Sequence, residues 1–349
     1  MSIIKCPNEI TGLNKKWKVF LAGPIQGAPE WQSQLPELEN VVWLSPRREK
    51  YPVENFNYDG QVEWETNTIR SANIVLFWIP EEDMSIAGRS YAQTTRFELG
   101  ENLARGKRII IGVNDKFPGR RYFEYKAEKY NVIGNQVFHT LEECIEALKS
   151  YIEDAEHYHK TYFTSDTHFG SERALTLSRR PFKNIEEMDW TMIERWNNVV
   201  NPSDTIWHLG DFGENWPLDY LSGNIKMVEG NYEREGKSTI DTDYLETYAK
   251  GAVLVDFPDK DGDKHAYCMS HEPLACKEAI CSWNRTIRRR EKRNIFGLFG
   301  HIHGRQRIKS FGMDVGVDCS NYTPVSMDEV NFYRNAVQRG FYDDNVWRQ

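Results

Sequence analysis

Short apolar runs separated by amphipathic stretches characterise the first part of the chain. Four of these runs lack the polar alternation of a half-exposed strand, so they predict strands that are buried on both faces. They cover residues 18–22, 41–44, 73–79 and 108–113, and segments with helical spacing lie between them at about 61–71 and 93–105. Such an alternation predicts an α/β domain in which helices cover both faces of a parallel sheet.

The segments that follow these strands predict a binding crevice. Ligands of open parallel sheets bind at the carboxyl ends of the strands. Gly23 and Pro24 follow the first strand, residues 45–47 follow the second, and Pro80 stops the third. We therefore expect these turns, together with the start of the helix at 93–105, to line one crevice.

Periodic apolar positions extend the prediction beyond this sheet. Thr140 and Glu143 form the pattern of a capping box, and apolar residues at intervals of three and four continue after it as a helix. A second series of strands begins at Lys160, so we expect one domain at 1–157 and another at 158–349. Further helices are expected at 185–199, 239–250 and 327–339.

Polar residues with metal-ligand chemistry follow five apolar runs in the second part of the chain. They are Asp166 with His168, then Asp211, Asn231, His271, and finally His301 with His303. Carboxylate oxygen and imidazole nitrogen together suit divalent transition metals. Two such ions close together can clamp a phosphate and supply hydroxide near neutral pH. The order of these residues therefore predicts a binuclear metal site at one rim of a second α/β domain.

These five blocks resemble the signature of the calcineurin-like metallophosphoesterases, which reads Asp-x-His, Gly-Asp, Gly-Asn-His-Asp/Glu, a lone His and Gly-His-x-His. The match covers about residues 160–335 and implies the layered α/β sandwich of that family. By this resemblance the metal ligands are Asp166, His168 and His303 for one ion, Asn231, His271 and His301 for the other, and Asp211 as the bridge. Asp211, Asn231 and His271 would also act in catalysis, and Mn, Fe, Zn or Ni would suit the two divalent sites.

One position departs from this signature. The third block reads Gly-Asn-Tyr-Glu, so Tyr232 stands where the family has the His that is expected to protonate the leaving group or stabilise the transition state. A phenol has a pKa of about 10, which suits that role less well near pH 7 than an imidazole does. Asn231 is retained, so we expect metal binding to persist and Tyr232 to contact the substrate.

The first part of the chain is similar to the nucleoside 2-deoxyribosyltransferase-like family over about residues 16–114. The matching blocks are 19–25, 45–48, 58–65, 75–80 and 95–100. The resemblance implies a parallel-sheet domain of the Rossmann or flavodoxin type that binds a nucleoside or nucleotide. It assigns Glu98 as the carboxylate that traps or stabilises the anomeric carbon when a glycosidic bond breaks.

Neighbouring residues complete this candidate site. Gly23 and Pro24 would let a sugar or a phosphate approach the backbone closely. If the substrate is a nucleotide, Arg47 and Arg96 would neutralise its 5′-phosphate, with surface pairing to nearby Glu residues as an equal alternative.

The residue that would exchange protons with Glu98 is left open. Asn73 stands where the family often has Asp. Asp59 and Glu65 are the substitutes that the sequence offers, although both also read as surface charges.

Composition favours a globular protein of the cytoplasm. No run approaches 18 consecutive apolar residues, so we expect no membrane span, and the first residues lack the apolar core of a signal peptide. The six scattered cysteines among 349 residues predict a reducing compartment rather than a disulfide framework. The sequence leaves the oligomeric state open, a homo-oligomer included.

The distribution of charge along the chain indicates which kinds of substrate or partner it could bind. The net charge of −8 argues against bulk affinity for nucleic acid. A basic segment at 285–293 nevertheless lies between two of the metal-ligand blocks. It reads either as a solvated surface or as a flap that recruits a polyanionic substrate.

Together these patterns predict a cytoplasmic, bifunctional enzyme of nucleotide metabolism. Its first half would cleave or exchange N-glycosidic bonds, and its second half would hydrolyse phosphoesters with two divalent metals. Two alternatives remain. One is a binuclear phosphodiesterase or nuclease whose first half only binds a nucleotide, which the basic segment favours and Tyr232 opposes. The other is a nucleotide-binding sensor, which the departures at Asn73 and Tyr232 keep open.

Overall fold

The chain divides into two compact units in a computed structural model that describes residues 3–49, 56–88, 90–259, 262–286 and 294–342. Unit 1 comprises Met1–Tyr158 and unit 2 comprises His159–Gln349. All six cysteines are free thiols. Among the described residues, no helix is both long enough and apolar enough to cross a membrane.

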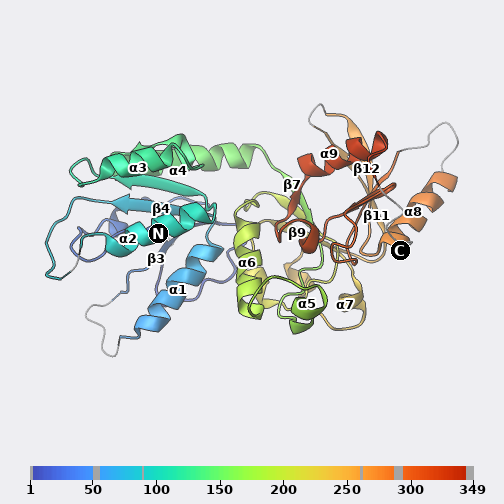
Figure 1. Cartoon of the computed structure of the whole chain (residues 1–349), viewed down its shortest axis with the longest axis horizontal. Coiled ribbons are helices and arrows are strands. Elements are labelled where there is room, and N and C mark those ends of the chain that lie inside the picture. Colours follow the sequence, from blue (N-terminus) through green and yellow to red (C-terminus); the bar gives the residue numbers. More distant parts are fainter. Residues whose placement is uncertain (1–2, 50–55, 89, 260–261, 287–293, 343–349) are drawn as a thin grey trace. The chain divides into compact units, whose positions relative to one another are not determined.

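A six-stranded parallel sheet forms the centre of unit 1 (Figure 1). Its strand order is β1 (Ile3–Lys5), β3 (Val41–Ser45), β2 (Trp17–Ala22), β4 (Ile74–Ile79), β5 (Ile109–Val113) and β6 (Val137–Phe138). The four predicted strands are β2 to β5, and every residue in them is buried. The two edge strands were not predicted, because two or three residues are too few to show a pattern.

Helices cover both faces of this sheet. They are α1 (Tyr58–Ser71), α2 (Gln93–Ala104), α3 (Arg120–Ala127) and α4 (Leu141–His157). Trp17, Val19 and Leu21 alternate along β2 and pack in one apolar cluster with Cys144 and Leu148 of α4. The predicted capping box at the start of α4 is confirmed.

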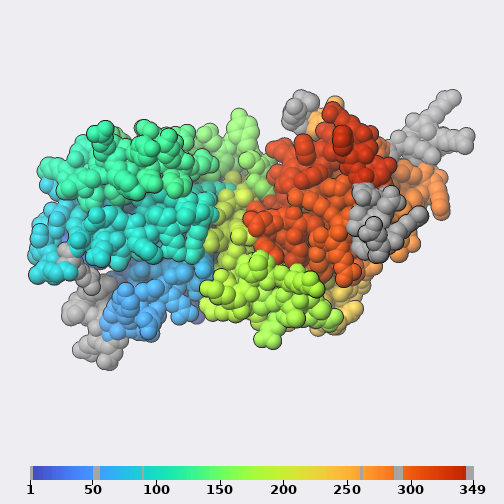
Figure 2. Space-filling model, viewed as in Figure 1, coloured from blue at the N-terminus to red at the C-terminus, as the bar shows by residue number. Residues whose placement is uncertain are grey.

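The residues between these positions face the other side of the sheet. Phe20 and Ala22 of β2 line a cavity together with Glu98 of α2. In the space-filling view of unit 1, α1 forms the lower blue edge and α3 and α4 form the upper green edge (Figure 2).

Unit 2 contains two five-stranded sheets. The first has the order β10 (Thr247–Ala249), β9 (Asn224–Val228), β8 (Thr205–His208), β7 (Thr161–Thr164) and β16 (Val325–Ser326). The second has the order β11 (Val253–Pro258), β12 (Lys264–Met269), β13 (Phe296–Phe299), β15 (Gly312–Asp314) and β14 (Ile308–Lys309). Strands β7 to β10 run parallel to one another in the first sheet, as do β12, β13 and β15 in the second.

The two sheets of unit 2 share one apolar core. Phe163 and Trp207 from the first sheet pack in the same cluster as Tyr267, Leu298 and Met313 from the second. Helix α6 (Ile185–Asn197) packs against the first sheet in a separate cluster, and α8 (Pro273–Thr286) packs against the second in another. The shorter helices are α5 (Glu172–Leu177) and α7 (Asn231–Arg234), and α9 (Met327–Gln338) is the last.

The helices expected at 185–199 and 327–339 are confirmed as α6 and α9. The helix expected at 239–250 is wrong. Asp241 caps a short 3₁₀ turn instead, and Thr247–Ala249 then pairs with β9 as a parallel edge strand. Thr and Tyr favour strands. The backbone hydrogen-bonding groups at the edge of β9 pair with this segment, which the helical spacing of its sequence did not predict.

Candidate functional site

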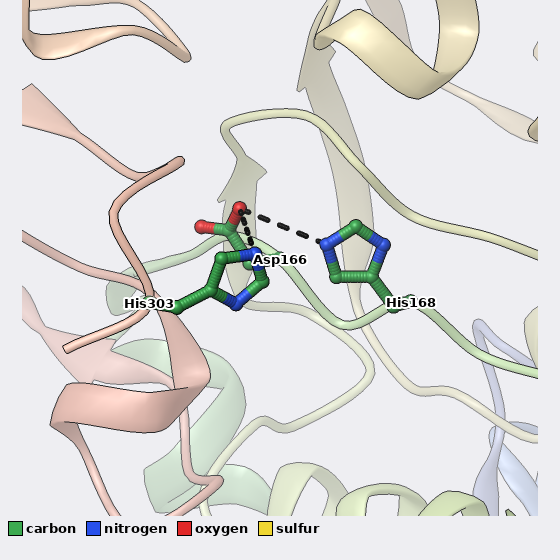
Figure 3. A group of neighbouring side chains, drawn as sticks. All are labelled: Asp166, His168 and His303. Atoms are coloured by element: carbon green, nitrogen blue, oxygen red, sulfur yellow. Dashed lines mark ion pairs between the residues drawn. The ribbon is translucent and has the colours of Figure 1, made fainter. Parts of the chain in front are cut away.

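Asp166, His168 and His303 form one group of potential metal ligands, named group A here (Figure 3). Their ligand atoms lie within 4.8 Å of one another. The Nε2 atoms of His168 and His303 each lie 4.0 Å from Oδ1 of Asp166, and both imidazoles face that carboxylate. Three donors at this spacing can contact a single ion.

Asp211, His271 and His301 form a second group with the same spacing, named group B. Asn231 joins it, because its Oδ1 atom lies 3.0 Å from Nε2 of His271 and 3.0 Å from Nδ1 of His301. All seven residues predicted as ligands therefore fall into two neighbouring sets.

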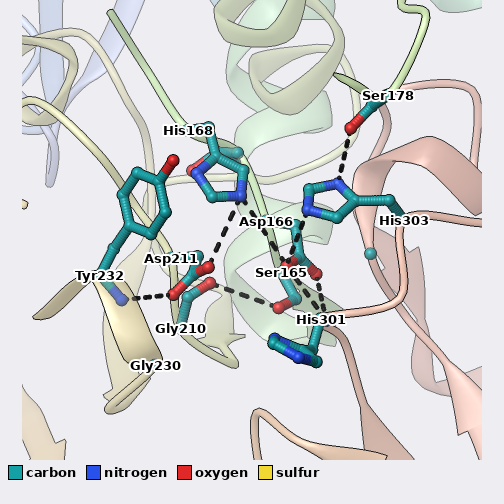
Figure 4. A network of polar contacts seen from close by, with 12 residues as sticks. Ser165, Asp166, His168, Ser178, Gly210, Asp211, Gly230, Tyr232, His301 and His303 are labelled. Carbon is teal, nitrogen blue, oxygen red and sulfur yellow. Dashed lines mark hydrogen bonds and ion pairs between the residues drawn. The ribbon is translucent and has the colours of Figure 1, made fainter. Parts of the chain in front are cut away.

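The carboxylate of Asp211 lies between the two groups (Figure 4). Its Oδ1 atom is 3.4 Å from Nε2 of His271 in group B, and its Oδ2 atom is 3.6 Å from Nε2 of His168 in group A. Burial alone would raise the pKa of Asp211, but its hydrogen bond with His271 and the neighbouring charge outweigh burial and hold the pKa at about 2. An ionised carboxylate with one oxygen toward each group has the geometry of a bridging ligand.

The ligand residues sit where the backbone leaves its strands. Asp166 follows β7, Asp211 follows β8, Asn231 follows β9, and His271 and His301 follow β12 and β13. The pairing of β7 with β8 continues past both strands, since the amides of Asp166 and His168 donate to the carbonyls of Gly210 and Asp211.

Strained backbone marks the same positions. Asp166, His168, Asp211, His301 and His303 have φ values of 58°, 50°, 58°, 72° and 48°, in the left-handed region that residues with a Cβ rarely adopt. Such conformations cost on the order of 1–3 kcal/mol each and cluster at functional sites. Gly230, after β9, lies close to Asp211, after β8. A Cβ at Gly230 would come within 2.4 Å of Oδ1 of Asp211.

The chemistry of His168 fits a metal. Its side chain is 3 % exposed, and neither ring nitrogen has a hydrogen-bond partner among the described residues. Leaving such groups unpaired in a protein interior is costly, so a bound cation would remove a penalty. Burial lowers the pKa of His168 to about 4, which keeps the imidazole neutral at pH 7, the form that binds metals.

Two other imidazoles are held by a second contact. Nδ1 of His271 donates to the carbonyl of Leu209 at 2.8 Å, which leaves Nε2 to face group B. Nδ1 of His303 lies 2.9 Å from Oδ2 of Asp318 and 3.0 Å from Oγ of Ser178, which leaves Nε2 to face Asp166. Metal-binding histidines commonly fix their orientation in this way.

Sequence reasoning missed the residues that hold these ligands. Arg180 is buried and pairs with Asp318, and it also donates to the backbone carbonyls of Asp166 and Thr167. The carboxylate of Glu233 accepts hydrogen bonds from the amides of Asp211 and Gly230, at 2.9 Å and 2.8 Å, and from that of Phe212. Glu233 stands in the recognised third block, which could have identified it, whereas Arg180 and Asp318 lie in no recognised motif.

Tyr232 lies beside group A (Figure 4). Its ring centroid is 4.4 Å from that of His168, and its amide donates to Oδ1 of Asp211. Tyr232 also lines a cavity of about 330 Å³ together with the histidines of group A, Asp211 and Asn231. The structure thus brings this predicted substrate residue to the metal-ligand cluster.

In unit 1, the expected crevice is a cavity of about 640 Å³. The predicted site residues that line it are Gly23, Pro24, Arg47 and Glu98, and Glu65 joins them. Two tryptophans explain why glycine is required at position 23. A Cβ at Gly23 would come within 2.3 Å of the Trp78 carbonyl and 2.8 Å of the Trp31 ring. Gly23 therefore permits close packing within the protein as well as access to its backbone.

Arg96 points away from this cavity. Its guanidinium donates to the carbonyls of Tyr91 and Ala92 and lines a separate cavity. Arg47 does reach the first cavity, and its Nε atom donates to Gln32 at 2.8 Å. The structure thus separates the two arginines that were predicted to share a phosphate.

Two carboxylates, Glu98 and Glu65, lie in the unit 1 cavity. Burial, together with the smaller effects of the negative charges of Glu65 and Glu101, raises the pKa of Glu98 to about 7. Burial also raises the pKa of Glu65, against a hydrogen bond from Gln61. A pair of carboxyl groups with raised pKa values in one cavity is a typical arrangement for proton exchange.

Of the proposed proton partners, Glu65 is therefore the one that lies with Glu98. Asp59 is exposed in the first turn of α1. Asn73 lies at the amino end of β4, where its Oδ1 atom accepts from the Lys18 amide, so it is at the opposite end of the strands from the cavity. The basic segment 285–293 lies outside the described residues from 287 to 293.

Comparison with known proteins supports the assignment of unit 1. Residues 16–117 match the family model described as "Nucleoside 2-deoxyribosyltransferase like". Unit 1 thus carries a nucleoside 2-deoxyribosyltransferase-like domain, and the segment that matches contains Gly23, Arg47, Glu65 and Glu98.

Curated relatives of the chain are short and without a described activity. An uncharacterized protein of Methanocaldococcus jannaschii is 28% identical over 177 residues, which cover 48% of this chain and 88% of the relative. The gene 66 protein of Mycobacterium phage L5 is 34% identical over 82 residues, or 21% of this chain and 39% of that protein. The gene 66 protein of Mycobacterium phage D29 is 25% identical over 215 residues, or 51% and 98%.

One solved structure, of a protein of unknown function from Aquifex aeolicus, aligns with a TM-score of 0.37 and 21% identity. It covers 50% of this chain and 99% of that chain.

Proposed function

We propose that unit 2 hydrolyses phosphoesters with two divalent metal ions held by groups A and B. The observation that carries this proposal is the Asp211 carboxylate, which directs one oxygen toward His168 of group A and the other toward His271 of group B. When bound, such ions supply charge neutralisation and activate water for attack on phosphorus.

The residues of the chain supply the geometry for this reaction. Asp211 fixes the spacing of the two groups, while Asp318 and Leu209 orient the imidazoles of His303 and His271. The cavity of about 330 Å³ beside the ligands admits a phosphate group with part of its organic substituent. The layered metallophosphoesterase sandwich implied by the sequence resemblance belongs to the same proposal, supported by two sheets that share one core.

A metal titration tests this proposal. The protein is first freed of metal with a chelator and then incubated with Mn²⁺, Zn²⁺, Ni²⁺ or Fe²⁺. Its metal content and its rate of p-nitrophenyl phosphate hydrolysis are then measured. We expect about two ions per chain and activity that chelation abolishes. Metal content well below one ion per chain after loading with every ion would refute the proposal.

We infer a second activity for unit 1, the cleavage or transfer of an N-glycosidic bond. The specific observation that favours it is the position of Glu98 in the cavity of about 640 Å³, beside Glu65 and within the segment that matches the transferase-like family. A carboxylate here can stabilise the developing cation at the anomeric carbon or bond to it.

The second activity is tested by the release of free base from deoxynucleosides and deoxynucleotides. We expect Glu98→Gln to reduce base release by several orders of magnitude and to leave phosphate release unchanged. Glu63→Gln is the matched control, because Glu63 is an exposed carboxylate of unit 1 that does not line the cavity. Base release that is absent from the wild-type protein on every substrate would make unit 1 a binding domain.

The two activities together define a bifunctional enzyme of nucleotide metabolism. A phosphatase could produce the nucleoside that the first unit cleaves, or remove phosphate from the sugar that it releases. Retention of both activities in one purified chain, each lost separately through its own variant, is the expected result.

A further inference from the structure

We propose that the substrate of the metal site in unit 2 is a phosphoanhydride, an organic diphosphate whose terminal phosphate is removed. This inference rests on the proposed phosphoester hydrolysis and names its substrate class. It comes from the cations that line the cavity beside groups A and B.

The residues that line the cavity form two chemically different sets. The first set comprises histidines of both groups together with Asp211 and Asn231. The second set comprises Arg173, Ala174, Leu177, Ser178, Tyr232, Glu235 and Lys237. A phosphate bound to the metals inside this cavity would have its leaving group near residues of the second set.

Two cations and one carboxylate provide the charge of the second set, namely Arg173, Lys237 and Glu235. Lys237 forms an ion pair with Glu235, and its ammonium lies 5.6 Å from the ring centroid of Tyr232. The Tyr232 ring in turn lies 4.4 Å from the His168 ring, so the ammonium is one aromatic ring away from group A. Arg173 has no acidic partner within the described part of the chain and Lys237 is paired with Glu235, so the second set has a net positive charge.

A leaving group determines which side chains an active site needs. The alkoxide that leaves an alkyl phosphate needs a proton, whereas a leaving phosphate needs its negative charge to be neutralised. The imidazoles that line this cavity, His168, His301 and His303, all belong to group A or group B. Among the described lining residues, a leaving group therefore meets guanidinium and ammonium groups rather than a free imidazole.

The reaction balances with water as the only co-reactant. Attack of a water oxygen on the terminal phosphorus forms one P–O bond and breaks the bond to the bridging oxygen. The bridging oxygen keeps the electron pair and leaves on the organic monophosphate, whose charge Arg173 and Lys237 stabilise. One proton of water remains on inorganic phosphate, and the other passes to solvent.

The experiment compares three substrates on the metal-loaded full-length protein. ADP is the diphosphate, AMP is the matched monoester, and p-nitrophenyl phosphate is an activated ester without a second phosphate. We expect kcat/KM for ADP to exceed that for AMP by at least tenfold. Arg173→Gln and Lys237→Gln should each lower kcat/KM for ADP by about tenfold, less than the loss of an enclosed donor because both side chains are exposed.

The same two variants should keep p-nitrophenyl phosphate hydrolysis within about twofold of the wild type, because that substrate has no leaving phosphate to neutralise. Lys183→Gln is the control, since Lys183 is an exposed cation of unit 2 that lies outside the cavity lining. Metal content and melting temperature of each variant confirm that the fold is intact.

Four outcomes separate the two proposals. Equal losses on ADP and p-nitrophenyl phosphate, or a wild-type preference for AMP, would overturn the phosphoanhydride assignment while phosphoester hydrolysis stands. No hydrolysis of any substrate by metal-loaded protein would overturn both. Selective loss of ADP hydrolysis in the two cavity variants supports the assignment.

Discussion

The guanidinium of Arg180 contacts both carboxylate oxygens of Asp318, with Nε 2.9 Å from Oδ1 and Nη2 3.0 Å from Oδ2. Asp318 in turn holds Nδ1 of His303, and Arg180 also donates to the Asp166 carbonyl. The buried Arg180–Asp318 pair therefore holds two residues of group A, His303 and Asp166, in position.

Replacing Arg180 by Met should weaken group A and destabilise unit 2. The change leaves the Asp318 carboxylate buried without its partner, which typically costs 3–5 kcal/mol. Loss of such supporting contacts commonly lowers metal affinity about 10–100-fold. Calorimetric metal titration and thermal unfolding measure the two effects, with Arg179→Met as the exposed neighbouring control. Unchanged metal affinity would show that His303 does not depend on this pair.

Asp211→Asn should impair both metals together. An amide supplies one neutral oxygen in place of two charged ones, so it cannot bridge groups A and B as the carboxylate can. We expect metal content to fall from about two ions to fewer than one per chain at limiting metal. Asp219→Asn is the control outside the site. Loss of only one ion would assign Asp211 to a single group.

Base release by unit 1 should depend on pH through Glu98. The carboxylate must be ionised to stabilise a cation, and its folded pKa is about 7. Activity should therefore rise with pH through about 7 and then level. Because the folded pKa is raised above the ordinary value, Glu98 favours the folded state at low pH and loses that contribution as pH rises through about 7. A pH–rate profile with an acid limb near the ordinary Glu value would contradict this prediction.

Glu65→Gln should shift that acid limb to lower pH. The negative charge of Glu65 is one cause of the raised pKa of Glu98, so its removal makes ionisation of Glu98 easier. The matched control is Glu63→Gln on the same helix, where the side chain is exposed. An acid limb that stays in place in Glu65→Gln would leave burial and the charge of Glu101 as the causes of the raised pKa.

Tyr232→His should raise hydrolysis of alkyl phosphodiesters more than hydrolysis of p-nitrophenyl phosphate. The substitution puts an imidazole beside group A, where it can protonate a poor leaving group. Activity on both substrates is measured at equal metal loading. Equal changes on the two substrates would argue against a position for Tyr232 at the leaving group.

The strand ends were predictable from sequence because each combines an apolar run with a polar residue directly after it. Their convergence follows from parallel pairing, which brings Asp166, Asp211 and Asn231 to one edge. The same rule placed Gly23, Arg47 and Glu98 around one cavity.

What the sequence could not reveal depends on contacts between distant segments. Asp318 reaches His303 from a 3₁₀ turn, and Arg180 reaches Asp318 from the loop after α5, over 138 residues. Neither position has an apolar pattern or motif around it. Arg96 was likewise unpredictable in its contacts: it was expected to neutralise a 5′-phosphate with Arg47, whereas its guanidinium donates to the carbonyls of Tyr91 and Ala92.

Glu233 bears on how ions would enter the proposed metal site. Its carboxylate ties the amides of Asp211 and Gly230 together, so two strand ends are joined by the protein's own hydrogen bonds. Metal ions that meet such a prearranged set of ligands need not organise the chain, in contrast to small zinc domains that fold only around their ion. If groups A and B bind metals as proposed, the ions would therefore act as exchangeable ligands rather than as parts of the scaffold.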